Sequence, residues 1–465
     1  MELSASFNVF LKVLLLPVAI IEASRSLGPP PPFWRNDSAN LAFTASINKY
    51  LSHVPFTNTH DGSITDVRPV RLDWDIVGDM PNAFKDGVAC WMPPDLLFPE
   101  GEVLIAGGLW PIGIAHMGGH NRLNFSYSYD VSRQTWKPLP LPPFTAGRTQ
   151  GACLQTSLII ISGGDGGTVG SRVMRLSKSL SDNKWTWDTD LPALPSNASR
   201  ITGAAHSISD RWLVIGLGNN DGPAASKAGA LVPYRLDLQK PHLQWEAIPA
   251  YPFVGATPTD PQEISVPISA SVNGKWLVFG GQTQFAKGSA ALEAWGEIPA
   301  DLATMAVFGH RPTGSTIDIR NAYAYDPITN QWETLPKLPL NFVQGPKHAP
   351  VVGDRYVLLI GAQRRLSARR GQEPPGYLAQ VGRPEIADIV QYYGEDVIFY
   401  DVVERVYGAI GKMPYGVVTA SWVCNGTHTL GFGGEPTHGW NGNTESAIQM
   451  AKITVDRDPS SSMIG

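Results

Sequence analysis

The residues that could carry chemistry stand in short glycine-rich segments, not in a complete catalytic motif. Glu435 directly follows Gly433-Gly434 and is the candidate general acid or base, because such work needs a carboxylate or a histidine within reach of the substrate. A second segment holds four arginines: Arg364, Arg365, Arg369 and Arg370. This segment fits either an anion cradle or a solvated loop. The sequence contains no serine nucleophile elbow, phosphate-binding loop or paired-carboxylate motif.

Three histidines raise the question of a metal site. His116 and His120 lie in one glycine-rich stretch, and His438 lies near the end of the chain. No acidic or cysteine ligand stands at a spacing typical of metal motifs. We therefore expect no metal and no cofactor, and we count His438 among the ligand-binding candidates.

The composition favours many short strands over long helices. The chain has 465 residues, with 47 glycines, 39 prolines and 14 tryptophans, and only 17% of its residues are charged. Short strands joined by Gly/Pro turns give such a profile. The net charge is −5 and no basic cluster of domain scale is present. Nucleic acid is therefore not expected as a partner.

The N-terminus has the pattern of a secretory signal peptide. Lys12 precedes the apolar run from Val13 to Ile21, and the small residues Ala23 and Ser24 follow at a plausible cleavage point. The run is too short to cross a bilayer well, and no later stretch has a transmembrane pattern. We expect residues 1–24 to be removed and the protein to be secreted, with no stable membrane span.

Four Asn-x-Ser/Thr sequons agree with export, because they are the acceptor sites for N-glycosylation. They are Asn36, Asn124, Asn197 and Asn425. Each sequon alone is a common chance match, but together with the leader they predict an extracellular glycoprotein.

An internal repeat organises the rest of the chain. One phrase, an aromatic residue followed by a proline-terminated turn, occurs six times: Trp74–Pro81, Trp136–Pro142, Trp187–Pro195, Trp245–Pro252, Trp332–Pro339 and Tyr407–Pro414. A Tyr-Asp pair precedes three of these phrases at a fixed offset: Tyr129-Asp130, Tyr325-Asp326 and Tyr400-Asp401. Between the phrases lie β-rich runs that end in paired glycines, such as Gly107-Gly108, Gly163-Gly164, Gly280-Gly281 and Gly433-Gly434.

This run-Gly-Gly, Tyr-Asp and Trp order resembles the kelch repeat. It covers about residues 70–456 and implies an all-β, six-bladed kelch β-propeller. We expect the paired glycines to allow close packing near the axis, the Tyr-Asp pair to position a turn, and the Trp to wedge between blades.

The phasing also predicts how the ring closes. The first phrase has no glycine-pair run before it, and the last glycine pair has no Trp phrase after it. An N-terminal strand should therefore complete the last blade, which leaves no open sheet edge. The expected organisation is a signal peptide at 1–24, a Pro-rich arm at 25–69, the propeller at 70–456 and a disordered tail at 457–465.

The resemblance implies that the loops after the glycine pairs and those before the first strands meet at one mouth of the central channel. Lys85 and His348 belong to the second set. The candidate ligand-binding residues are Trp110, Arg148, Asp165, Arg200, Asn219, Gln282, Lys347, Arg364 and His438, with Glu435 as the catalytic candidate. Such a polar ring suits a polyhydroxylated or anionic ligand. The alternative is that these groups pair with one another and line a water-filled pore.

The three cysteines, Cys90, Cys153 and Cys424, lie in apolar repeat strands. An odd count excludes a complete disulfide framework. The residues are either small buried hydrophobes or include one disulfide between neighbouring blades.

Two function classes remain open. The chain is similar to the N-acetylneuraminate epimerase (mutarotase) propellers, which implies a carbohydrate isomerase that uses a Glu after a glycine turn, although here no Arg closely follows Glu435. The galactose oxidase central domain is a more distant resemblance. The first expectation is a mouth that binds a small polar or sugar-like ligand, with or without isomerising it. The second is a non-catalytic platform for a protein or glycan.

Overall fold

The computed structural model describes residues 64–65, 67–94, 101–111, 120–122, 124–145, 147–165, 168–179, 181–195, 198, 202–218, 232–252, 264–286, 314–318, 320–339, 342, 345, 347–367, 389–436 and 446–456. The signal peptide predicted at 1–24, almost all of the arm predicted at 25–69 and the tail predicted at 457–465 lie outside these residues.

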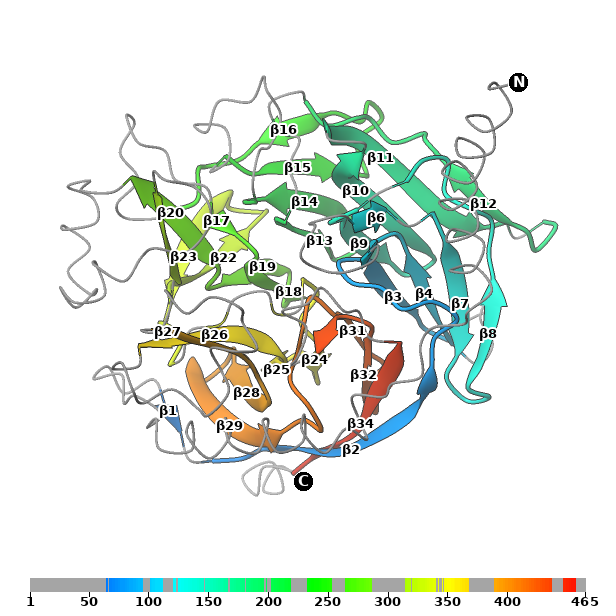
Figure 1. Ribbon diagram of the computed structural model, residues 1–465. Coiled ribbons are helices and arrows are strands. Elements are labelled where there is room, and N and C mark those ends of the chain that lie inside the picture. Colours follow the sequence, from blue (N-terminus) through cyan, green and yellow to red (C-terminus); the bar gives the residue numbers. More distant parts are fainter. Residues whose placement is uncertain are drawn as a thin grey trace, which may run out of the picture.

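Six four-stranded antiparallel sheets stand around a common axis, so the chain is a six-bladed β-propeller as predicted (Figure 1). Blade one contains β3 (Val88–Met92), β4 (Glu102–Ala106), β7 (Ser126–Asp130) and β8 (Thr135–Pro138). Blade two contains β9 (Gln150–Leu154), β10 (Ser157–Asp165), β11 (Thr168–Lys178) and β12 (Trp185–Asp188). Blade three contains β13 (Ala204–Ile208), β14 (Trp212–Gly216), β15 (Tyr234–Asp237) and β16 (Trp245–Ala247).

The second half of the ring repeats this order. Blade four contains β18 (Ile268–Val272), β19 (Lys275–Phe279), β22 (Ala322–Asp326) and β23 (Gln331–Leu335). Blade five contains β24 (Val351–Val352), β25 (Tyr356–Leu359), β28 (Asp396–Asp401) and β29 (Val406–Lys412). Blade six contains β31 (Ser421–Cys424), β32 (His428–Phe432), β34 (Ala447–Val455) and β2 (Val70–Asp79).

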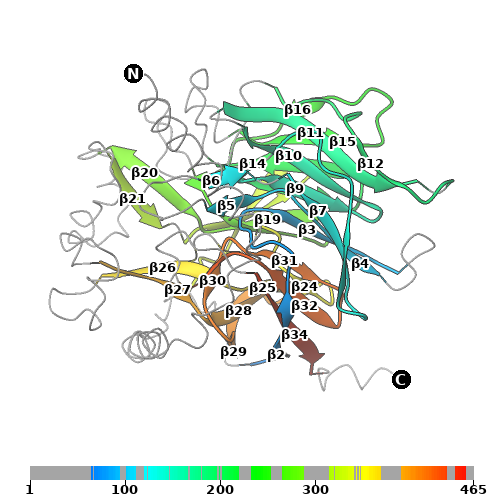
Figure 2. The ribbon, with the colours of Figure 1, turned by 45° about the vertical axis from the view of Figure 1, so that its right-hand side comes forward.

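Short additional strands leave the blades. Three short strand pairs each follow the second strand of a blade. They are β5 (Leu109–Pro111) with β6 (His120–Arg122), β20 (Gln282–Ala286) with β21 (Gly314–Asp318), and β26 (Ala362–Ser367) with β27 (Ile389–Gly394). Figure 2 shows β20–β21 and β26–β27 on one side of the ring. β17 (Ile264–Ser265) joins β20, β30 (Val417–Val418) pairs with β33 (Glu435–Pro436), and β1 (Ile64–Thr65) adds in parallel to β29.

The hydrophobic core is divided into six clusters, and each cluster lies between two neighbouring blades. Val88 and Cys90 of β3 pack with Leu158 and Ile160 of blade two. Ala89, between them in sequence, packs instead with residues of blade six. Strand side chains alternate between the two faces of a sheet, so each blade needs both neighbours to bury its apolar residues.

The N-terminal strand closes the ring, as the phasing predicts. β2 pairs antiparallel with β34 along its length, from Val70 opposite Val455 to Asp79 opposite Ala447. Figure 1 shows β2 in blue beside β34 in red, at the outer side of blade six. The two ends of the described chain therefore share one sheet, and this pairing covers the edge that β34 would otherwise expose.

Five of the six recurrent aromatic residues link their blade to the one before it by a hydrogen bond, whereas Trp74 packs edge-on against Trp422. Trp136 donates its indole N–H to Asp79 O (3.1 Å), and Trp332 donates to Pro249 O (2.8 Å). The other members of the series, with their acceptors, are Trp187 with Pro140 O (2.8 Å), Trp245 with Pro192 O (2.8 Å) and the Tyr407 hydroxyl with Pro336 O (2.7 Å). In every case the acceptor belongs to the preceding phrase, so the aromatic-proline repeat builds the joint between blades.

The Tyr-Asp pairs hold the turn that leads to this aromatic residue. Asp326 Oδ1 accepts the backbone N–H groups of Ile328 (2.8 Å) and Thr329 (3.2 Å). The preceding Tyr325 lies opposite Trp332 on the paired strand, with ring centroids 5.3 Å apart. The aspartate fixes the turn and the tyrosine packs on the aromatic residue that reaches the preceding blade.

Removing β2 tests the closure. A chain that begins at Gly87 lacks β2 and therefore the pairing of β2 with β34. It also lacks the Trp74 ring, which packs edge-on against Trp422. Trp74 is partly buried, so its loss costs less than the roughly 3–5 kcal/mol of a fully buried aromatic, but the exposed edge of β34 adds to this cost and promotes aggregation. We expect this chain to be insoluble and one that begins at Asp66 to fold. A soluble, monomeric Gly87 chain that melts as cooperatively as the longer one would contradict six-blade closure.

Tyr407→Phe tests one joint between blades with little change in volume. The substitution removes the hydroxyl that donates to Pro336 O and leaves that carbonyl without its partner. We expect the free energy of unfolding to fall by about 1–2 kcal/mol, measured by chemical denaturation. Tyr400→Phe is the matched control on the neighbouring strand, because the Tyr400 hydroxyl forms no hydrogen bond with a described residue. Equal losses in both variants would contradict the role of the bond.

Candidate functional site

The backbone before blade one is held between the glycine turns of two blades. Lys85 N donates to Leu109 O (3.0 Å) and Leu109 N donates to Lys85 O (2.8 Å). On the blade-six side, Gly434 N donates to Phe84 O (2.7 Å). A Cβ on Gly108, whose φ is 110°, would lie 2.7 Å from Lys85 O. Only glycine fits this approach, so the paired glycines fix where Lys85 enters the mouth.

The predicted acid/base residue, Glu435, forms an ion pair with Lys85. The two side chains are 13% and 8% exposed, and Glu435 begins β33 directly after the glycine pair of blade six. Burial lowers the pKa of the Lys85 ammonium, Asp86 opposes this effect, and the Arg148 guanidinium lowers the pKa further. The pair therefore places a carboxylate beside an ammonium group that is less basic than usual.

A second ion pair lies beside the first. Lys347 Nζ is 3.0 Å from Asp86 Oδ1 and donates to Thr149 O (2.8 Å), so this blade-five side chain reaches the entries of blades one and two. Burial acts to raise the pKa of Asp86, but the Lys347 and Lys85 ammonium groups and the Arg148 guanidinium outweigh it and lower the pKa. Asp86 is therefore held as a carboxylate.

Arg148 completes this charge cluster, which we define as Lys85, Asp86, Arg148, Lys347 and Glu435. Its guanidinium is partly exposed and forms no ion pair with the residues that the structure describes. The cluster holds three basic and two acidic side chains, so it carries a surplus of positive charge. Such a surplus suits an anionic ligand.

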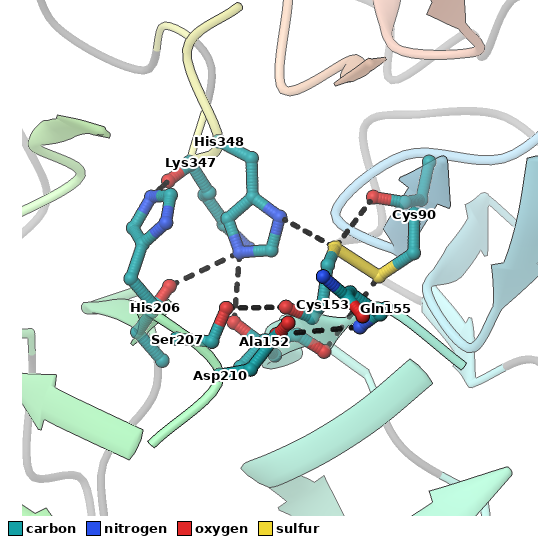
Figure 3. Close-up of a disulfide and its surroundings, with 12 residues drawn as sticks. Cys90, Ala152, Cys153, Gln155, His206, Ser207, Asp210, Lys347 and His348 are labelled. Carbon is teal, nitrogen blue, oxygen red and sulfur yellow. Dashed lines mark hydrogen bonds between the residues drawn. A yellow bond between two sulfur atoms is a disulfide. The ribbon is translucent and has the colours of Figure 1, made fainter. Parts of the chain in front are cut away.

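Below the charge cluster, the segment that leads into blade five fills the axis. His348 Nε2 lies 2.8 Å from Gly151 O and 3.0 Å from Ala205 O, so this nitrogen carries the hydrogen. His206 Nε2 donates to Lys347 O (3.1 Å), and the two imidazole rings stack with centroids 4.4 Å apart. Figure 3 shows both histidines side by side, with His348 pointing at the disulfide. Residues from blades two, three and five are thereby joined across the axis.

Cys90 and Cys153 form a disulfide between the innermost strands of blades one and two, which settles the open alternative for two of the three cysteines. His348 Nδ1 lies 3.5 Å from Cys153 Sγ. Cys424 stays a thiol, and burial raises its pKa.

Of the predicted site residues, the structure brings together Arg148, Lys347 and Glu435. Gln282 lies in β20, opposite Ser265, and has no described contact with the charge cluster. For Trp110, Asp165 and Arg364 the structure describes the backbone but not the side chain, and Arg200, Asn219 and His438 lie outside the described residues.

The sequence interpretation missed Asp86 and His206. Asp86 stands at the same place before its blade's first strand as Arg148, and both have a positive φ, of 57° and 50°. That shared offset in the repeat was the available signal. His206 lies inside β13, where nothing in the sequence separates it from a core residue.

Two predicted glycosylation sites can be placed. Asn124 is exposed just before β7, and Asn425 lies in the turn between β31 and β32. Asn36 and Asn197 lie outside the described residues.

Comparisons with known proteins identify no relative: no protein-family description matches the chain, and no curated protein matches it significantly. Within the described residues, no group of three or more His, Cys, Asp or Glu side chains is arranged to hold a metal ion. The same part of the chain contains no helix long and apolar enough to cross a membrane.

The buried histidines predict a loss of stability in mild acid. Burial lowers the pKa of His348, and burial together with His348 lowers that of His206 well below 6.5. Lys347, Asp86 and the disulfide surround them, so an added proton meets no unpaired anion. The unfolded chain takes up protons below about pH 6.5 and the folded chain does not.

We therefore expect the free energy of unfolding to fall as pH drops from 6.5 to 5, by up to on the order of 1.4 kcal/mol per pH unit for each histidine. His206→Gln should reduce this slope, because glutamine can still donate to Lys347 O but does not titrate. The exposed His242→Gln is the control and should leave the slope unchanged. A wild-type stability that is flat over this range would contradict the interpretation.

Proposed function

We propose that this protein is a secreted propeller of the kelch type whose central mouth binds a small anionic, carbohydrate-like ligand and transfers protons to and from it. The observation that carries the proposal is the buried Lys85–Glu435 ion pair beside the partly exposed Arg148 guanidinium. These groups come from blades six, one and two, and the glycine turns hold the first two in place.

A buried ion pair is poor evidence for stability, because removing two charges from water costs as much as their attraction returns. Buried groups with shifted pKa values gather at functional sites. The charge cluster combines both features with a surplus of positive charge, so a ligand carboxylate facing Arg148 would complete the charge balance.

The Lys85–Glu435 pair suits opening of a sugar ring. Glu435 accepts the proton of the anomeric hydroxyl while Lys85 donates one to the ring oxygen, and the bond between that oxygen and the anomeric carbon breaks. The lowered pKa of Lys85 favours donation, because a general acid works best with a pKa near the working pH. Reversal of these transfers closes the ring on either face, which is the reaction of a mutarotase.

A second candidate is a non-catalytic platform for a protein or a glycan. His348 and Lys347 fill the axis beneath the charge cluster, which favours a partner that contacts the mouth without entering a deep channel. The same charged groups would then contribute hot-spot contacts.

Secretion is supported by the leader at 1–24, by the sequons and by the disulfide. A disulfide between Cys90 and Cys153 is typical of proteins that fold in an oxidising compartment. Asn124 and Asn425 stand at positions that a glycan can occupy without entering the core.

Ligand binding is tested by thermal shift of the protein recovered from culture medium, against neutral sugars and sugar acids. We expect a sugar acid to raise the melting temperature, and Arg148→Ala to weaken its affinity by about 10–100-fold, the cost of losing a charged hydrogen bond. Glu435→Gln should slow anomer exchange, followed by exchange NMR, by about 10²–10⁴-fold. The exposed Arg133→Ala and Glu404→Gln are matched controls.

Flat shifts with every sugar and sugar acid would overturn the ligand proposal. A stoichiometric protein partner captured from the medium and lost on Trp110→Ala or Arg365→Ala would instead favour the platform. Binding that persists in Glu435→Gln with unchanged anomer exchange would retain the ligand and remove the catalytic step.

A further inference from the structure

A small cavity lies on the axis where blades one, two, five and six meet. Its lining includes Ala89, Gly151, Lys347, Thr419 and Ser421. It has room for about one particle the size of a water molecule. The cavity is therefore too small for the ligand proposed at the mouth, and it is a separate site.

Two hydroxyl groups in the lining have no partner. Ser421 is 7% exposed, and its Oγ is buried without a hydrogen bond to any described residue. Thr419 Oγ1 lies in the loop before the same strand. It is also buried without a hydrogen bond to any described residue. Buried hydroxyls are almost always hydrogen-bonded, and two of them around one space indicate an occupant that forms hydrogen bonds with both.

Lys347 supplies a third donor. Its ammonium group has three hydrogens, of which one goes to Thr149 O and one to Asp86. Lys347 also belongs to the lining of the cavity, and its third ammonium hydrogen has no partner among the described residues.

One carbonyl of the lining is already used, because His348 donates to Gly151 O. An ammonium group and two hydroxyls that can donate thus belong to the lining, next to a charge cluster with surplus positive charge.

We propose that this cavity is a binding site for one monoatomic anion of the size of chloride, held by Ser421 Oγ, Thr419 Oγ1 and Lys347 Nζ. The anion links the loop of blade six to the side chain of blade five beside the strands of blades one and two. It thereby stabilises the part of the ring where the N-terminal and C-terminal halves meet. The site shares Lys347 with the charge cluster, but it holds a different ligand from the mouth.

The direct test is diffraction from crystals grown in sodium bromide, with bromide located by anomalous scattering at its absorption edge. We expect one bromide peak in the cavity within hydrogen-bond reach of Ser421 Oγ. A water molecule at that position, with no anomalous signal, overturns the proposal.

Thermal denaturation gives a second readout in solution. At equal sodium concentration, chloride should raise the melting temperature above its value in methanesulfonate, an anion too large to enter the cavity, by about 2–5 °C. Ser421→Ala removes one donor and should reduce this difference, whereas the buried Ser128→Ala, on the third strand of blade one, should not. Equal melting temperatures in both salts overturn the proposal. Glu435→Gln should keep the chloride response, which separates this site from the proposed function.

Discussion

The hydrogen bond from a recurrent aromatic residue to a carbonyl of the preceding blade, which joins five of the six pairs of neighbouring blades, is the interaction on which the ring depends. A blade shares apolar surface with both neighbours, but such packing alone does not fix how far one sheet rotates against the next. An indole N–H must meet its acceptor within a narrow range of angle and distance. Trp332 and Pro249 therefore set the angle between blades three and four, and the same joint, repeated around the ring, sets the blade count.

The same requirement explains why tryptophan dominates the series. Its ring covers a large apolar area while its N–H finds a partner at the edge. Tyr407, the exception, reaches an equivalent carbonyl through its hydroxyl. The joint between blades six and one uses Asp79 O, in a strand from the other end of the chain, so Trp136 also locks the closure.

The repeated phrase in the sequence predicted the architecture. It did not predict the contacts between side chains that lie far apart in the sequence. The fixed spacing of aromatic, proline and glycine residues predicted six blades and the N-terminal closing strand, because the same short phrase recurs once per blade, although the two residues of each joint lie 47–83 positions apart. Arg148, Lys347 and Glu435 were identified from their place in the repeat. The pairing of Lys347 with Asp86 was not, because these residues are separated by 261 positions and only the closed ring brings them together. His348 was expected near the mouth, but its hydrogen bonds to Gly151 and Ala205 were not predicted, since they too join residues far apart in the sequence.

The position of His348 over the disulfide has a consequence for the order of assembly. Cys90 and Cys153 emerge from the ribosome when blades one and two are complete, well before residue 348 has been synthesised. During that interval the sulfur atoms are not yet covered by the blade-five segment, and an oxidant can reach them. Once blade five docks, the imidazole lies against Cys153 and Cys90 is fully buried. The order of synthesis thus leaves the two cysteines open to oxidation before blade five covers them, and the finished fold shields the bond from exchange with external thiols.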